Sequence, residues 1–367
     1  MVRKIRQLSL IYKKSIKNFF PLLKNGTKNI IKDIPHQLNN LKMRIFSFKG
    51  GLTILCLVFL IIFPFFPKIF PDIPKVRYYV TLIMFAMIFA IFGASWDFLT
   101  GFVGQVSFGH AIFFGMGGYA GALLLQNYGL SWFESIFAGA IVAVLIGLLI
   151  AIPTMRLRGP YLALGTQAFA LITFNLMLTE DELVVFPKFT QYYYVSQYFI
   201  ILAFMLVSIT IMFIIVKSKM GTIFNSIRDD QVAAEASGIN TTKYKLIAFM
   251  ISSFFAGIAG GLYMVKLPTV SYGNFNALYS FTAIIFAAIG GIASITGAVV
   301  GSFLYWIVNE IFYDLFSNYL KIQALADYGP VLFFSLFLIL VIRFSDRGIM
   351  KPIIEGLKDL WDLLLGR

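Results

Sequence analysis

The stretch "FGHAIFFGMGGYAGALLL", Phe108 to Leu125, is nearly long enough to cross a bilayer, yet it carries one histidine and five glycines. A spanning helix needs roughly 20 mostly apolar residues, because the hydrocarbon core is about 30 Å thick. Helices in lipid use small residues to bring their backbones close together. The stretch therefore predicts a membrane helix that packs tightly against its neighbours and places one titratable ring near its start.

The composition of the whole chain agrees with that prediction. Of the 367 residues, 59% are hydrophobic and only 13% are charged, which is typical of an integral membrane protein. We expect an all-α fold with about ten transmembrane helices, in a range of nine to eleven. The predicted spans lie near 50–66, 78–99, 102–125, 132–152, 160–178, 195–216, 246–266, 278–294, 297–315 and 328–344. The pair between 278 and 315 is also compatible with one span and a re-entrant piece.

The net charge of +13 is concentrated at the start of the chain, where residues 1–49 hold twelve Lys or Arg against Asp33 alone. Apolar residues recur there at helical spacing, which predicts either an amphipathic helix on an anionic membrane surface or a solvated tail. Because cations in short loops remain cytoplasmic, we expect both termini and the loop 217–245 on that side. Three parts follow: the basic extension 1–49, a transmembrane domain 50–345, and the cytoplasmic tail 346–367.

Small residues recur at spacings of four, as at Gly117 and Gly121 and at Gly257 and Gly261, and predict a tightly packed bundle. The glycines between 101 and 118 are denser than packing requires. A similar pattern at 286–304 is a weak internal symmetry that favours two related halves around a central path.

Ionisable residues inside spans are costly and usually face the bundle interior or a water-filled path. The candidates for lining a translocation path are Asp97, Gln105, Ser107, His110 and Gln167. A second interpretation stays open for His110, whose neutral ring can hydrogen-bond a carbonyl and close a contact between helices.

No stretch fits the phosphate-binding pattern G-x-x-x-x-G-K-[ST], and the chain has two histidines in all, His36 and His110. We therefore expect no catalytic residues, no metal site and no cofactor in this chain, and no enzymatic activity. An ion-coupled secondary transporter would have to rely on Asp97 and His110 alone. A permease powered by another subunit needs only a cytoplasmic surface that the ATP-hydrolysing subunit can bind.

The loop 217–245 offers such a surface. Thr222 to Ser237 predicts one short amphipathic helix with arginine and carboxylates on its polar side. Its apolar side is predicted to carry Ile223, Ile227 and Ala234, and the place of Val232 on that side stays open. We expect Gly238 to end this helix in the left-handed conformation, and Thr241 or Thr242 to cap the next span. An ordered helix here is suited to transmitting force, although an interfacial helix without a partner has the same pattern.

Three blocks resemble one known family, the LivM-type permeases of branched-chain amino acid ABC importers. The blocks are "SWDFLTGFVGQVSFGHAIFFGMGGYAGALL" (95–124), "RLRGPYLALGTQAFALI" (156–172) and "SIRDDQVAAEASGINTTKYKLIAFMISSFFAGIAGGLY" (226–263). The third block contains "AAEASGI", which is similar to the motif that docks ATPase subunits in that family. The resemblance covers about 80–350, most of the chain.

The resemblance implies an importer of the inner membrane, built from two permease chains, two cytoplasmic ATPase subunits that bind ATP, and an extracytoplasmic solute-binding protein. Carried over position by position, the role of coupling to the ATPase falls on Arg228, Asp230, Ala234, Glu235 and Gly238. The substrate is then most simply a branched-chain amino acid, and no nucleic acid partner is implied.

Two departures from the family leave the substrate open. The basic segment 1–49 is unusual, and the external loop "TEDELVVFPKFTQ" (179–191) lacks the Thr-Gly-Gly stretch typical of the family. A related permease for urea, nucleosides or sugars is the alternative within the class, and an ion-coupled secondary transporter is the alternative outside it. The pairing of the permease with itself or with a homologue also stays open.

Overall fold

The computed structural model describes residues 48–69, 75–155, 157, 159–179, 184–185, 194–267, 269–270 and 272–322, together with 325, 329–330, 332–336 and 339. The chain divides into two units, residues 1–62 and 63–367. In the first unit the described element is the apolar helix α2, Phe48–Ile62. The predicted extension 1–49 lies outside the described residues except for its last two, and the tail 346–367 lies outside them entirely.

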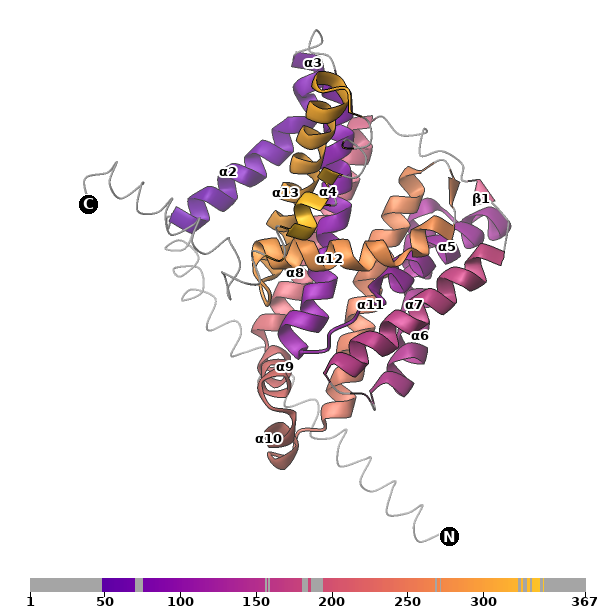
Figure 1. Ribbon diagram of the computed structural model, residues 1–367, viewed down its shortest axis with the longest axis vertical. Coiled ribbons are helices and arrows are strands. Elements are labelled where there is room, and N and C mark those ends of the chain that lie inside the picture. The colour runs from indigo at the N-terminus through magenta and orange to yellow at the C-terminus, as the bar shows by residue number, and fades with distance from the viewer. Residues whose placement is uncertain are drawn as a thin grey trace, which may run out of the picture. The chain divides into compact units, whose positions relative to one another are not determined.

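The second unit is built almost wholly of helices (Figure 1). Its α-helices are α3 (Phe66–Ile69), α4 (Val76–Asp97), α5 (His110–Tyr128), α6 (Trp132–Thr154), α7 (Pro160–Thr179), α8 (Tyr194–Lys217), α9 (Lys219–Asp229), α10 (Gln231–Ala236), α11 (Thr241–Lys266), α12 (Ala277–Gly290) and α13 (Ile295–Asp314). Short 3-10 turns are η1 (Phe63–Phe65) and η4 (Tyr272–Phe275), and π turns are η2 (Phe98–Phe102) and η5 (Leu315–Tyr319).

Six helical segments among the described residues are long and apolar enough to cross a membrane. They are Val76–Phe102, Trp132–Thr154, Pro160–Thr179, Val195–Lys217, Thr241–Lys266 and Ile295–Ser317. Helix α5 is not among them, since its glycines and polar residues dilute its hydropathy. The total of about ten spans stays a prediction, because the last predicted span, 328–344, is described only in part.

One predicted span boundary was wrong. The span expected from residue 102 begins as a helix only at His110, because the chain leaves the helical path after Val103, with Gly104 at φ 73°. Trp96 Nε1 donates to Ser107 O at 2.7 Å, and Phe108 N donates to Thr166 Oγ1 at 3.0 Å, which fixes the irregular segment against its neighbours.

Helix α12 has 14 residues and is therefore about 21 Å long, too short to cross the hydrocarbon core. Figure 1 shows it running across the long helix α4 rather than along it. This agrees with the second interpretation of residues 278–315, one spanning helix and one shorter piece.

The packing centre is α4, of whose most apolar window 94% is buried, compared with 22% for α7. Helix α11 packs against α4, and α5, α6 and α11 approach each other through glycines. A Cβ placed on Gly117 would collide with the backbone of Gly257, and one placed on Gly139 would collide with Gly117 O. The prediction that glycines at four-residue spacing bring these helices together is confirmed.

The loop 179–191, predicted on the external side, meets the loop that follows α11. The two-residue strands β1 (Val184–Val185) and β2 (Thr269–Val270) pair antiparallel, with Val184 opposite Val270. Residues 180–183 and 186–191 of this loop, which lacks the Thr-Gly-Gly stretch typical of the family, lie outside the described residues. Near the start of α4, Lys75 donates to Asp314 at 2.6 Å, and this hydrogen bond raises the pKa of Lys75 above its usual range.

Candidate functional site

The segment predicted as one helix over 222–237 is two helices. Asp230 has an extended backbone, with φ −154° and ψ 108°, and separates α9 from α10. Its Oδ1 accepts hydrogen bonds from Val232 N at 2.8 Å and Ala233 N at 3.1 Å. The carboxylate thus satisfies the first free amides of α10, and the single-helix prediction was wrong because a cap is locally more favourable than continuation.

The end of α10 follows the predicted pattern more closely. Gly238 has φ 83°, and Ile239 N donates to Ala234 O at 3.1 Å, so the left-handed glycine that ends the helix is confirmed. The predicted cap of the next span was wrong by one or two residues. Asn240, rather than Thr241 or Thr242, is the N-cap of α11, and its Oδ1 accepts from Lys243 N at 3.0 Å.

The buried side of this helix pair differs in part from the prediction. Ile227 and Ala234 are buried as expected, whereas Val232 is 63% exposed. Phe224, which was not assigned to this side, is fully buried and packs edge-on against Phe98 at 5.7 Å between ring centroids. Phe224 and Ile227 stand three residues apart, a helical spacing that was present in the sequence.

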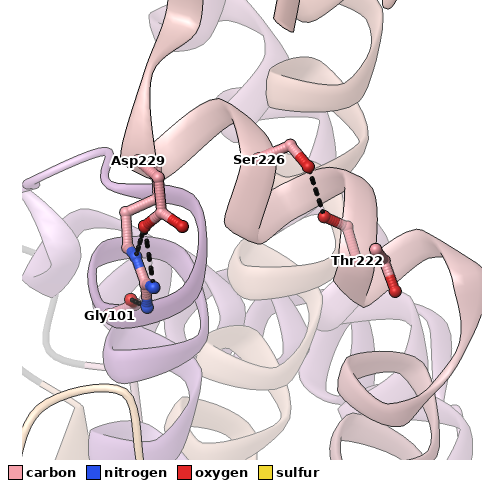
Figure 2. A network of polar contacts seen from close by, with 5 residues as sticks. Gly101, Thr222, Ser226 and Asp229 are labelled. Carbon is pink, nitrogen blue, oxygen red and sulfur yellow. Dashed lines mark hydrogen bonds and ion pairs between the residues drawn. The ribbon is translucent and has the colours of Figure 1, made fainter.

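Arg228 joins α9 to the π turn η2 that follows α4. Figure 2 shows Gly101 and Asp229, two of its partners. Arg228 Nη1 donates to Gly101 O at 3.0 Å, while Nε and Nη2 donate to Asp229 Oδ1 at 3.0 and 2.9 Å. Gly101 lies in the π turn η2, where the carbonyls at the end of a helix need donors from outside the helix. A cation also interacts favourably with the negative end of the helix dipole.

The chain comes close to α9 again just after this π turn, at Gly104. A Cβ on this residue would lie 3.0 Å from Arg228 Cγ and 3.2 Å from its Cα. A larger residue here would press directly on the backbone of α9. The first glycines of the block 101–118, Gly101 and Gly104, therefore contact α9. The later glycines of the block allow α5 to pack against α6 and α11.

A second polar network ties α10 to α11. Glu235 Oε1 accepts from Thr241 Oγ1 at 2.6 Å and from Gln231 Nε2 at 2.9 Å, and Lys245 Nζ donates to Gln231 Oε1 at 2.6 Å. Sequence reasoning missed Gln231 and Lys245, and it assigned Thr241 only as a cap. Their signal was two pairs spaced by four residues, Gln231 with Glu235 and Thr241 with Lys245, each on one helix face.

The five residues predicted to couple to an ATPase do not all reach the surface. Arg228, Asp230, Glu235 and Gly238 are exposed, whereas Ala234 is only 4% exposed and packs inward. The helix pair therefore has a buried side that anchors it to α4 and α11 and an outer side with carboxylates, an arginine and Val232.

The described hydrogen bonds of the translocation-path candidates are made with other residues. Asp97 is fully buried, and its two carboxylate oxygens each accept one backbone N–H at 2.8 Å, from Ala293 and Ser294. Gln105 Nε2 makes a long hydrogen bond of 3.4 Å to Val103 O. Among the described residues, no hydrogen bond or ring contact links two of the five candidates.

His110 is fully buried at the first position of α5, between the rings of Phe92 and Phe113. Its Nε2 lies 2.9 Å from Ser95 Oγ, which itself donates to Phe92 O at 2.7 Å. When the single serine proton is donated to Phe92 O, Nε2 of the histidine is the donor to Ser95 Oγ. This supports the interpretation of a neutral ring at a helix contact, although the serine replaces the expected carbonyl.

Five buried side-chain polar atoms in the described residues have no hydrogen-bond partner, and three of them are Ser107 Oγ, His110 Nδ1 and Gln167 Oε1. These three belong to residues predicted for the path, and unsatisfied buried polar atoms call for a reason. The role of Ser107, His110 and Gln167 in transport stays a prediction.

Spanning apolar helices, close packing through glycines and an ordered helix pair outside the spans define a multi-pass membrane protein. The chain belongs to the family described as branched-chain amino acid transport system / permease component, whose model matches residues 78–342.

Individual relatives agree with this membership. Over 268 residues the chain is 26% identical to the high-affinity branched-chain amino acid transport system permease protein LivM of Salmonella typhimurium, covering 64% of this chain and 63% of that relative. It is 34% identical to LivH of Escherichia coli over 143 residues, 38% of this chain and 42% of the relative.

BraD of Pseudomonas aeruginosa is 25% identical over 300 residues, 73% of this chain and 93% of the relative. The match to LivM covers 63% of the length of that relative, less than the match to BraD covers of its own. These relatives are named as transport permeases, not enzymes. No solved structure matches the chain.

Proposed function

We propose that this chain is the membrane-spanning permease subunit of an ATP-driven importer that receives its substrate from a solute-binding protein. The helix pair α9–α10 is the part that ATPase subunits grip. The observation that carries this proposal is the construction of the pair: Phe224 and Arg228 fix it to the end of α4, while Asp230 and Glu235 remain at the surface. Rigid attachment on one side and a polar outer side are what a force-transmitting element needs.

Branched-chain amino acids are the proposed substrates, because the family and all the relatives described above carry that description. Similarity to both LivM and LivH supports a second permease chain in the complex. The remaining proposed partners are two cytoplasmic ATPase subunits, which bind the ATP, and an extracytoplasmic binding protein. In this proposal both termini and α9–α10 face the cytoplasm, and the membrane is the inner membrane.

An ion-coupled secondary transporter is not favoured. Such a mechanism would draw on Asp97 and His110, but the Asp97 carboxylate is occupied by two backbone amides and the His110 ring is enclosed between phenylalanines. Among the described residues, no hydrogen bond joins Asp97 to His110.

The test is purification and reconstitution of the chain with its partners. The proposal expects ATPase subunits to co-purify with the permease, and uptake of leucine or isoleucine into vesicles to require ATP and the binding protein. Glu235→Arg and Gly238→Trp should abolish uptake while leaving the chain inserted. Tyr128→Ala is the control, because Tyr128 is exposed at the C-terminal end of α5, away from α9–α10. It should leave both uptake and co-purification intact.

Uphill uptake by the lone chain driven by a proton gradient would contradict the proposal. So would undiminished uptake by the Glu235 and Gly238 variants at normal expression. A complex that assembles and hydrolyses ATP but imports another solute would retain the permease assignment and overturn only the substrate.

A further inference from the structure

Asp97 occupies the last position of α4 and holds a turn that lies far away in the sequence. Its Oδ1 and Oδ2 accept from Ala293 N and Ser294 N, both at 2.8 Å. Ala293 has φ 62°, a backbone conformation unfavourable for alanine by about 1–2 kcal/mol. The turn between α12 and α13 therefore depends on the carboxylate at the end of α4.

The same end of α4 is held from the other side by α9. Gly101 follows Asp97 by four residues, and its carbonyl accepts from Arg228 Nη1 at 3.0 Å. Gly101 has no room for a side chain: a Cβ there would collide with Asp97 Oδ1 and lie 2.5 Å from Ala293 N. The end of α4 is thus pressed between Arg228 on α9 and Ala293 in the turn.

The α12–α13 turn is rigidly connected to deeper parts of the bundle. Helices α12 and α13 cross in backbone contact, since a Cβ on Gly290 would collide with Gly297 O. At the other end of α12, Ser280 Oγ accepts from Ala111 N at 2.8 Å, in the first turn of α5. A displacement of the turn would therefore reach the start of α5, beside the irregular segment 103–109. Packed interfaces of this kind shift between discrete arrangements rather than deform continuously.

We propose that Asp97 is a positioning residue of the transport cycle: it couples α9 to the α12–α13 turn, so that movement of α9 reaches the membrane interior through the end of α4. This rests on the proposed function of α9–α10. It also replaces the earlier prediction for Asp97, because a carboxylate with both oxygens bound to backbone amides is suited to hold a turn rather than to contact a passing solute.

The experiment measures two movements in the full reconstituted complex. Spin labels on Thr222→Cys in α9 and on Ile292→Cys in the turn are each paired with a reference label on Ile141→Cys in α6. All three positions are exposed. Cys56, the one cysteine of the chain, is replaced by serine. Distances are compared between the nucleotide-free complex and the complex with a non-hydrolysable ATP analogue, and leucine uptake per ATP hydrolysed is measured in parallel.

In the otherwise native chain, we expect both distances to shift together by about 2 Å. In Asp97→Asn one oxygen still accepts an amide, but the new NH₂ group faces a second N–H donor. The α9 shift should persist, the turn shift should fall to less than half, and uptake per ATP should drop about tenfold. Asp97→Ala should lose more of the turn shift and more of the uptake per ATP than Asp97→Asn.

Ser302→Ala is the matched control. Ser302 Oγ donates to Ala86 O at 2.9 Å, so this variant also removes a buried hydrogen bond between α13 and α4, but at a site without a described contact to α9. It should keep both shifts and the native uptake per ATP. A merely stabilising role for Asp97 would make the two variants alike.

Each outcome bears on one proposal. An unchanged turn shift in Asp97→Asn would overturn the role of Asp97. In the native chain, movement of α9 without movement of the turn would also overturn the role of Asp97. The test therefore remains decisive even if the variants fail to insert into the membrane. Absence of any α9 shift on binding the nucleotide would instead overturn the proposed function of α9–α10.

Discussion

Glu235 and Thr241 are joined by a hydrogen bond of 2.6 Å between Oε1 and Oγ1, which closes the loop between α10 and the start of α11. Thr241 is 3% exposed, while Glu235 lies at the surface. The glutamate therefore presents a charge at the surface and also holds α10 to α11 through a hydrogen bond. A partner that contacts Glu235 acts directly on the first turn of α11.

This fastening predicts the effect of Thr241→Val, which keeps the shape of the side chain and removes the donor. A hydrogen bond to a charged group contributes about 1.5–3 kcal/mol. We therefore expect amide hydrogen exchange in 231–237 to become at least about tenfold faster, as measured by mass spectrometry. The exposed neighbour Thr242→Val should leave exchange unchanged. Equal exchange in the Thr241 variant and the native chain would show that the bond does not hold α10.

The cap at Asp230 gives a second prediction. Asp230→Ala removes the acceptor for Val232 N and Ala233 N and should destabilise α10 by about 1 kcal/mol. We expect weaker retention of ATPase subunits during purification. Asp230→Asn keeps a good N-cap and should retain them, so it separates the cap from the charge. Loss in both variants would mean that the charge of Asp230, not its cap, is what the partner needs.

A third prediction compares two glycines in the left-handed conformation, Gly104 at φ 73° and Gly129 at φ 63°. Alanine at either position costs about 1–2 kcal/mol in backbone strain. Only at Gly104 would the new Cβ also press on Arg228, whereas nothing lies within 4 Å of Gly129.

Both variants should therefore lose thermal stability, but only Gly104→Ala should lower uptake per ATP. Uptake and heat inactivation are measured on the same reconstituted complex. Equal transport in the two variants would contradict a role for the contact between Gly104 and Arg228.

Close packing of α5 against α11 gives a fourth prediction. Gly117→Ala places a methyl group against the backbone of Gly257, and overpacking of this kind costs about 1–3 kcal/mol. We expect a lower temperature of heat-induced aggregation in detergent. Gly51→Ala in α2, where nothing lies within 4 Å, is the control for alanine in an apolar helix and should have little effect. A native-like aggregation temperature for Gly117→Ala would mean that the two helices can separate without loss.

Several features could be predicted because they depend on neighbours in the sequence. Long apolar runs specify helices, since a backbone in lipid must satisfy its own hydrogen bonds. Gly238 ends α10 because the left-handed conformation needs a residue without a Cβ. The amphipathic pattern located α9–α10 and the burial of Ile227 and Ala234. The break at Asp230 could not be predicted with equal ease, because an aspartate suits both a helix surface and a cap.

The sequence by itself determined a helical membrane bundle, the glycine contacts within it and an amphipathic segment outside it, since each follows from periodicity and residue size. Only the tertiary structure decided what Asp97, His110 and Phe224 contact: the α12–α13 turn, Ser95 with two phenylalanines, and Phe98. A polar or aromatic side chain in a span needs a partner, but the partner comes from a segment distant in the chain. Its identity is fixed by which helices pack together, and local sequence does not contain that information.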